Sequence, residues 1–200
     1  MNYTGPKVKL SRKLGIPLTL KARKYMQKRP YPPGQHGRNR RFSKLSDYGK
    51  QLLEKQRLRY QYNISDRQLR RYFEKASRME GNTADNLIQL LERRLDAFVF
   101  HAGLARSIWA ARQYVTHGHI LVNGKKINIP SYQLNVNDEV QVKEKSRKLP
   151  CFQEAIRVAS PPPYIELSKA ELKARFLYIP PREEIPVICE VPQVIEFYAR

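Results

Sequence analysis

The alternation of apolar and polar positions is most regular between residues 94 and 142. At about 100° per residue, Ile108, Ala111 and Val115 fall on one face of a helix. Ser107 precedes them where an N-cap is expected, and Gly118 follows them where a left-handed C-terminal residue is common. The pattern therefore predicts a short helix with one buried face and one face that could read a ligand, and the flank beside the buried face holds Trp109, Arg112, Gln113 and Thr116.

A hairpin is predicted directly after this helix. The apolar run 120–122 leads into Asn-Gly at 123–124, which supplies the two positive φ angles of a type I′ turn. Val136, Val140 and Val142 around Asn137-Asp138 predict a further strand and a turn, with Glu139 and Gln141 alternating outward. We expect the turn to hold Lys125 and Lys126 beside the start of the helix, so that both elements present one cationic surface to a phosphate backbone.

Two capped helices are predicted before this region and one longer helix leads into it. Ser46 can cap a helix over 47–60, which would place Lys50 and Arg57 on its exposed surface. Ser65 has the capping-box spacing for a helix over 66–79. A third helix is expected to start near Thr83 and to bury one stripe: Leu87, Leu91, Leu95 and Phe98.

Arg94 falls inside that apolar stripe. A charged group there requires that the helix kinks or that the guanidinium is paired, for instance with a neighbouring acid. Such a violation of the local pattern often marks a site.

The C-terminal third mixes short elements with prolines. A short helix is expected in 149–160, and the segments 164–167 and 175–179 are expected to be strands that extend the hairpin sheet. An amphipathic segment from Pro192 onward predicts a last helix, since proline suits a first helical turn.

Charge identifies the class of partner. The chain holds 38 Lys or Arg against 18 Asp or Glu, a net charge of +20, and residues 1–60 contain seventeen of these bases but only Asp47 and Glu54 as acids. Such a surplus attracts a polyanion, and nucleic acid is the leading candidate. A basic surface kept for solubility is a weaker alternative. No apolar run is long enough to cross a bilayer, and we expect no membrane partner.

Residues 1–44 are predicted to form an extended basic arm, because prolines and glycines interrupt them and apolar periodicity is sparse. We expect this arm to be disordered in the free protein and to order on RNA. Its aromatic residues have two equally weighted roles, stacking on RNA or anchoring the arm to its own domain. These residues are Tyr3, Tyr25, Tyr31 and Phe42.

The sequence offers no catalytic set and no metal site. The four histidines have no thiol or carboxylate at metal-ligand spacing, and Cys151 and Cys189 form no paired motif. We expect no cofactor, no metal and no enzymatic activity. His117 and His119 either close the end of the helix or contact RNA, and both readings stay open.

Two stretches resemble a known family. The order RLD, AARQYV and HGHILVNGKKI is similar to the S-four RNA-binding domain, which also occurs in tyrosyl-tRNA synthetases and pseudouridine synthases. The segment RPYPPGQHG at 29–37, followed by SDYGKQLLEKQRLRYQYNISDRQLRRYFEKA, resembles the small-subunit ribosomal protein S-four family of bacteria and plastids. Together they extend the resemblance over nearly the whole chain.

The resemblance implies an α+β fold in three parts. An extended basic arm (1–44) precedes a helical domain made of residues 45–86 and 186–200, and an S-four RNA-binding domain (87–185), with helices packed on a small antiparallel sheet, is inserted into it. The implied function is early binding of the five-prime domain of small-subunit rRNA, which nucleates subunit assembly. The implied location is the bacterial cytoplasmic ribosome, or a plastid ribosome, near the mRNA entry path and neighbouring ribosomal proteins, with a contribution to translational accuracy.

The rRNA-binding residues expected from charge, position and resemblance are Arg29, Arg38, Arg40, Arg41, Lys44, Lys50, Arg57, Arg67, Arg70, Arg71, Arg94, Ser107, Arg112, Gln113, His117, His119, Lys125 and Lys126. For Arg94 the expected role is RNA-facing or site-organising. Many relatives carry a four-cysteine zinc site in the arm, but this arm has no cysteine, so zinc is not expected. The rival functions are an RNA-modifying enzyme, for which no stretch is free to form a catalytic domain, and a free RNA chaperone or stress factor.

Overall fold

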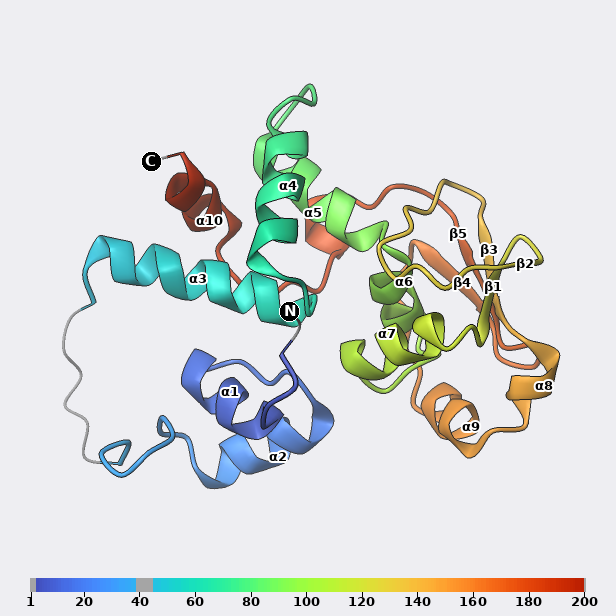
Figure 1. The fold of residues 1–200 in the computed structure, drawn as a ribbon, viewed down its shortest axis with the longest axis horizontal. Helices are drawn as coiled ribbons and strands as arrows, with labels where there is room; N and C mark the ends of the chain where they lie inside the picture. Colours follow the sequence, from blue (N-terminus) through green and yellow to red (C-terminus); the bar gives the residue numbers. More distant parts are fainter. Residues whose placement is uncertain (1–2, 39–44, 200) are drawn as a thin grey trace. The chain divides into compact units, whose positions relative to one another are not determined.

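The computed structural model describes residues 3–38 and 45–199, which form two compact units (Figure 1). The first unit comprises residues 1–84 and 187–200, and the second comprises residues 85–186. The predicted α+β class is confirmed, because helices occur together with a five-stranded antiparallel sheet.

The described part of the first unit is helical. Its helices are α1 (Lys7–Leu14), α2 (Leu20–Lys28), α3 (Asp47–Gln61), α4 (Asp66–Ala76) and α10 (Val191–Tyr198). Both predicted caps are present: the hydroxyl of Ser46 accepts from Gly49 N, and Ser65 forms a capping box with Gln68. Helix α4 ends at Ala76, three residues earlier than expected, and Gly81 follows with φ 96°.

The C-terminal segment returns to the N-terminal helices, as the resemblance implied. Gln51 Nε2 donates to Glu196 Oε2 at 2.9 Å, and the backbone N–H of Glu190 donates to Glu54 Oε2 at 3.0 Å. The rings of Phe73 and Tyr198 stack with centroids 5.1 Å apart. Helix α10 is therefore fixed to α3 and α4 by both polar and aromatic contacts.

The prediction that residues 1–44 lack regular structure is wrong for residues 7–28, which form α1 and α2. The sequence signal for these helices consists of only three apolar residues, Leu10, Leu14 and Ile16. All three are buried, and Leu53 and Tyr60 of α3 pack against them. Gly15 takes the left-handed conformation (φ 72°) that ends α1, and the Thr19 hydroxyl caps α2. Three apolar side chains are enough to form a small core for this segment, because α3 supplies the other half of the cluster.

The second unit contains a sheet in the order β2-β1-β3-β5-β4, with every neighbouring pair antiparallel. The strands are β1 (Ile120–Val122), β2 (Lys125–Lys126), β3 (Glu139–Val142), β4 (Ile165–Ser168) and β5 (Lys173–Phe176). The predicted hairpin is confirmed, since Asn123 (φ 49°) and Gly124 (φ 77°) form the turn between β1 and β2. The strand and turn expected around Asn137-Asp138 are present, since Asn137 has a positive φ (70°) and β3 follows, with Val136 exposed before it. Strand β5 begins two residues before the predicted segment.

The helices of the second unit are α5 (Thr83–Glu92), which begins at the boundary between the units, α6 (Leu95–His101), α7 (Ile108–Thr116), α8 (Glu144–Arg147), α9 (Pro150–Arg157) and the 3-10 helix η1 (Arg182–Glu184). Of these, α6, α7 and α9 share one apolar core with the sheet. Phe98 of α6, Val115 of α7 and Phe152 of α9 join Val140 of β3 in this core. The sheet and three helices thus position α7 and the hairpin.

The prediction of a single long helix from Thr83 through Phe98 is wrong, because the helix is interrupted between α5 and α6. Arg94 is extended (φ −68°, ψ 137°) and pairs with Gln133 as an isolated antiparallel bridge. The N–H of Leu95 donates to Tyr132 O at 2.9 Å. Backbone groups that a continuous helix would satisfy internally are therefore satisfied by the segment 132–134 instead. Both alternatives left open for Arg94, a break and a paired charge, are present.

Candidate nucleic-acid interface

Helix α7 has the two faces expected from the sequence. Ile108, Ala111 and Val115 are buried, and the Ser107 hydroxyl accepts from Ala110 N at 3.3 Å to cap the helix. On the flank, Gln113 and Thr116 are exposed, whereas Trp109 and Arg112 are half-buried. Capping fixes where the helix begins, and hence which side chains point away from the core.

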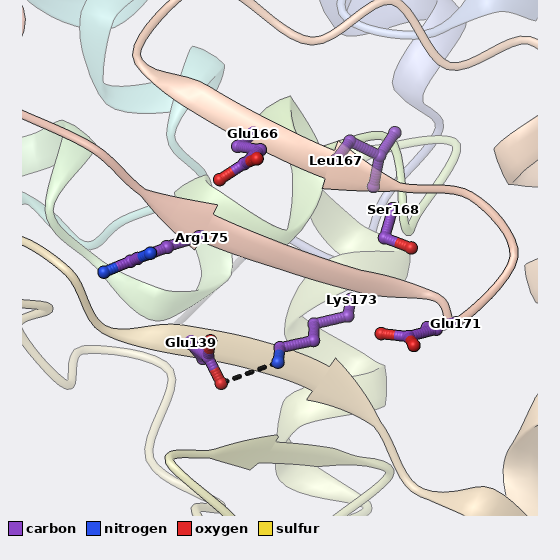
Figure 2. Close-up of a pocket in the computed structure, with 7 residues that line it drawn as sticks. All are labelled: Glu139, Glu166, Leu167, Ser168, Glu171, Lys173 and Arg175. Atoms are coloured by element: carbon purple, nitrogen blue, oxygen red, sulfur yellow. Dashed lines mark ion pairs between the residues drawn. The ribbon is translucent and has the colours of Figure 1, made fainter.

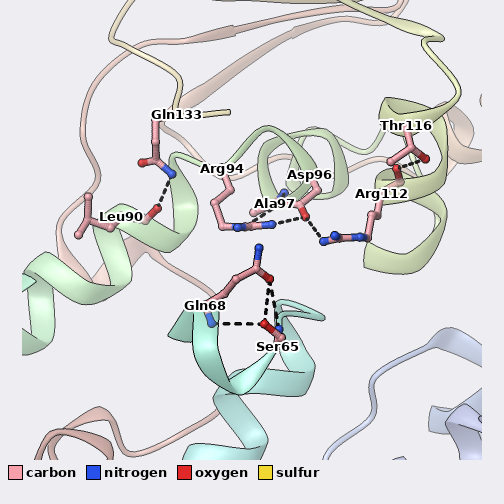
Figure 3. A network of polar contacts seen from close by, with 9 residues as sticks. All are labelled: Ser65, Gln68, Leu90, Arg94, Asp96, Ala97, Arg112, Thr116 and Gln133. Atoms are coloured by element: carbon pink, nitrogen blue, oxygen red, sulfur yellow. Dashed lines mark hydrogen bonds and ion pairs between the residues drawn. The ribbon is translucent and has the colours of Figure 1, made fainter. Parts of the chain in front are cut away.

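The carboxylate of Asp96 joins Arg94 and Arg112 in one polar network (Figure 3). Asp96 Oδ1 accepts from Arg94 Nε at 2.9 Å, and Oδ2 accepts from Arg94 Nη2 at 2.6 Å. Arg112 Nη1 reaches Oδ2 at 3.3 Å, and the Ala97 N–H donates to Oδ1 at 3.0 Å. One acid at the start of α6 therefore orients two guanidinium groups, one of them on α7.

Burial divides the roles of these two arginines. The side chain of Arg94 is 0% exposed, which contradicts an RNA-facing role and leaves the site-organising one. The side chain of Arg112 is 23% exposed, so part of it stays open to a ligand. Burial raises the pKa of Asp96, while both guanidinium groups and the Ala97 N–H act in the opposite direction.

Sequence reasoning missed Asp96 as a site residue. The signal was available, because Asp96 follows Arg94 by two residues and is the acid of the RLD segment. A buried arginine that begins a helix needs a carboxylate close by, and the first turn of that helix provides it.

The hairpin lysines are exposed, but not where they were expected. An ideal β-carbon on Gly118 would lie 2.2 Å from Lys126 Cε, so the Lys126 side chain crosses the residue just after the C-terminal end of α7. The expected position beside the start of the helix is wrong. Because only three residues, His117, Gly118 and His119, connect α7 to β1, and Lys126 pairs with Leu121, the lysine lies near the end of the helix.

The two histidines occupy the same end of α7. The His117 backbone N–H donates to Gln113 O at 2.9 Å and ends the helix, and His117 is an exposed residue. His119 Nδ1 is 2.9 Å from Ser146 Oγ, and burial together with the charges of His117 and Lys143 lowers the pKa of His119. Lys143 was not among the expected site residues, although it directly follows strand β3.

In the first unit, the exposed face of α4 gathers the densest set of predicted contacts. Arg67, Arg70 and Arg71 are all exposed, and Arg70 forms an exposed ion pair with Glu74 at 3.2 Å. Exposed pairs of this kind cost little to break, so a phosphate can compete for the guanidinium. Lys75 on α4 and Arg78, two residues beyond its end, are exposed as well.

The remaining basic candidates differ in exposure. Arg29, Arg38 and Lys50 are exposed, and Lys50 pairs with Asp47 at 3.0 Å. Arg40, Arg41 and Lys44 lie outside the described residues, as does Phe42.

The expectation that Arg57 lies on the open surface of α3 is wrong. Its Nε donates to Leu14 O at 2.8 Å, and its Nη1 forms an ion pair with Glu54 at 2.5 Å. The reason is the helical α1, which was not expected and whose last carbonyls need donors. Arg57 therefore joins α3 to α1.

The outer face of β3, β5 and β4 carries a different charge pattern (Figure 2). Its cavity, about 280 Å³, is lined by Glu139, Glu166 and Glu171 together with Lys173 and Arg175. Lys173 is paired with Glu139 at 2.8 Å. Because three carboxylates outnumber the two cations, this face attracts a phosphate backbone less than the cationic surfaces do.

Within residues 3–38 and 45–199, no group of three or more His, Cys, Asp or Glu is placed to hold a metal ion. None of the helices in that same part of the chain is both long and apolar enough to span a membrane.

The charge is unequally divided. Residues 1–84 and 187–200 hold 23 of the Lys and Arg and seven acids, whereas residues 85–186 hold 15 and eleven. The first unit thus carries most of the field that attracts a polyanion, and the second adds a small set of oriented groups.

Comparison with known proteins shows which family the chain belongs to. The model of the Ribosomal protein S4/S9 N-terminal domain matches residues 2–92, and that of the S4 domain matches residues 93–140. The chain is 50% identical over 204 residues to small ribosomal subunit protein uS4 of Streptomyces avermitilis, covering 100% of this chain and 99% of the relative. It is 48% identical over 207 residues to the Thermobifida fusca protein of the same name (100% of both chains), and 47% identical over 199 residues to that of Geobacillus thermodenitrificans (99% and 98%). With relatives 47–50% identical over nearly its whole length, the chain belongs to the uS4 family of small ribosomal subunit proteins.

Proposed function

We propose that this protein is a structural component of the small ribosomal subunit that binds small-subunit rRNA. The observation that carries the proposal is the exposed cationic surface of the first unit in a member of the uS4 family. A net charge of +20 is far more than solubility needs, and it supplies the sequence-independent part of RNA affinity.

The two units contribute differently to binding. In the first unit, the face of α4 with Arg67, Arg70 and Arg71 binds phosphates, joined by Arg29, Arg38 and Lys50 and by the basic residues of 40–44. In the second unit, Arg112 acts from a fixed position because Asp96 orients it, and such preorganisation lowers the entropic cost of the contact. Gln113, Ser107, His117, His119, Lys125 and Lys126 complete that surface.

The finer function rests on the family resemblance. The protein binds the five-prime domain of the rRNA early, nucleates assembly of the subunit, and lies beside neighbouring ribosomal proteins near the mRNA entry path, where it contributes to translational accuracy. Its mechanism is binding without turnover. The ribosome concerned is that of a bacterial cytoplasm, with a plastid ribosome as the second candidate.

Sedimentation of a cell lysate tests the proposal. We expect the protein in one copy per small subunit, with little at the top of the gradient. A predominantly free pool would favour the RNA chaperone or stress factor instead. Purified protein should also bind a transcript of the five-prime domain more tightly than an equally long transcript from another rRNA domain at the same salt concentration, and equal affinities would contradict the assignment of the domain.

A further inference from the structure

A cavity of about 770 Å³ in the first unit lies between α3 and the segment that follows α1 and α2. Its apolar walls come from Leu14, Pro30, Pro32, Leu45, Leu52 and Leu53. A volume of this size falls within the range of small-molecule sites, roughly 300–1,000 Å³. None of its lining residues belongs to α4 or α7.

Contacts within the first unit hold the two walls in place. Arg12 Nη2 donates to Tyr31 O at 2.9 Å and to Pro32 O at 3.2 Å, which ties the 31–32 segment to α1. Arg57 in turn ties α1 to α3 through the carbonyl of Leu14. The cavity is thus bounded by segments that are linked through side-chain hydrogen bonds.

Two tyrosine rings line the cavity, and each is held by a neighbour. Arg12 Cζ lies 4.9 Å from the ring centroid of Tyr31, and Arg59 Cζ lies 4.5 Å from that of Tyr60. The ring of Tyr3 meets Tyr60 edge-on, with centroids 5.6 Å apart. Aromatic rings fixed in this way are suited to stacking on a planar group.

The charges around the cavity all have one sign. Lys13, Arg38 and Arg59 are among the lining residues, and none of the lining residues is an acid. An apolar peptide side chain would also suit the leucines, but three cations without an acid favour a ligand that is flat and uncharged at its centre and anionic at its edges. A nucleotide in an RNA strand has this character.

We propose that this cavity takes an unpaired nucleobase of the bound rRNA, with its flanking phosphates held by Lys13, Arg38 and Arg59. The proposal rests on the proposed function and adds a site that reads a base, whereas the face of α4 contacts phosphates alone. A base is drawn out of a single-stranded or bulged segment and is bound between tyrosine and leucine side chains.

The test uses the full chain with the substitution Leu52→Trp, which places a bulky indole in the wall of the cavity, narrows it, and leaves every charge in place. The matched control is Leu20→Trp, since Leu20 is exposed on α2 and does not line the cavity. We expect Leu52→Trp to raise the Kd for small-subunit rRNA by about 5- to 150-fold, the range for loss of one stacked base. The salt dependence of binding should not change, because no phosphate contact is lost. Leu20→Trp should bind like the wild type.

Ultraviolet crosslinking of the complex, followed by mass spectrometry, gives a second readout that does not depend on the measured affinity. We expect nucleotide adducts on Tyr31 or Tyr60, and their loss in Leu52→Trp. If Leu52→Trp fails to fold by circular dichroism, Tyr31→Leu replaces it, because this change removes the ring and keeps an apolar side chain.

The outcomes separate this inference from the function on which it rests. If the wild type binds no small-subunit rRNA, the proposed function fails and the inference fails with it. If the wild type binds tightly, yet Leu52→Trp binds equally well and neither tyrosine carries an adduct, only the nucleobase site is wrong. Unchanged affinity with a lowered melting temperature would also contradict the nucleobase site, because it would show that Leu52 contributes to packing and not to binding.

Discussion

Asp96 is a buried acid whose partners come from three positions in the chain. It accepts from Arg94, from Arg112 and from the Ala97 N–H, and it is 1% exposed at the side chain. A buried ion pair adds little to stability compared with apolar residues, but removing one partner leaves the other charge uncompensated. The network therefore acts chiefly to fix geometry: it holds the start of α6 and directs Arg112.

We predict that Asp96→Ala lowers the free energy of unfolding by about 3–5 kcal/mol, because the Arg94 guanidinium stays buried without this carboxylate. Trp109, the single tryptophan, lies on α7 and reports unfolding of the second unit by fluorescence during denaturant titration. The control is Glu171→Ala, an exposed acid of the same unit, which should change stability by less than about 0.5 kcal/mol. A similarly small effect for Asp96→Ala would show that the network is dispensable.

At the scale of elements, the helix caps define where side chains can act. Helix α7 begins at Ile108 because the Ser107 hydroxyl takes the Ala110 N–H, and α4 begins in the same way with a full capping box at Ser65. Since Arg112 and Gln113 lie one turn further on, a shift of the start of α7 would rotate both of them relative to the sheet. The cap thus contributes to the interface without touching RNA.

We predict that Ser107→Ala costs about 1 kcal/mol of stability in the second unit, whereas Ser107→Asp keeps most of it, because aspartate is also a good N-cap. Denaturant titration followed by Trp109 fluorescence measures both variants. If Ser107→Asp is as unstable as Ser107→Ala, the hydroxyl has another structural role than capping.

The elements that could be predicted are those whose sequence signal lies within a few neighbouring residues. The cap at Ser107, the Asn-Gly turn and the strand at 139–142 are encoded within a few residues, and all three are present. The break at Arg94 depends on backbone pairing with Gln133, 39 positions later in the chain, which no local pattern contains. The helices of 7–28 depend on burial against α3, and for the same reason Arg57 was placed on the wrong surface.

At the scale of the whole molecule, charge and geometry are divided between the two units. The first unit holds 23 bases and seven acids, and two of its exposed cations, Arg70 and Lys50, form exposed ion pairs with Glu74 and Asp47. The second unit is close to neutral and instead holds its key arginine in a fixed network. We expect the first to set the strength and salt dependence of RNA binding and the second to refine its specificity.

We predict that combining Arg67→Gln, Arg70→Gln and Arg71→Gln lowers the slope of log K against log salt concentration by about 2–3, since each lost phosphate contact removes roughly 0.7–0.9. The matched control combines Arg157→Gln, Lys169→Gln and Arg175→Gln, three exposed cations of the second unit that are not among the expected contacts. It removes the same charge and should change the slope by less than about 1. Equal changes in both variants would mean that net charge, not the face of α4, governs binding.

The return of α10 to α3 has a consequence for biosynthesis. A chain made from its N-terminus presents α3 and α4 early, yet the partners of Gln51, Glu54 and Phe73 are residues 190–198, which emerge more than a hundred residues later. The segment between them can complete its own sheet and core first, because all five strands lie within residues 120–176. We therefore expect the second unit, which is synthesised later, to fold first. The helices α3 and α4, which are synthesised earlier, remain incompletely packed until translation ends, because α10 is made last.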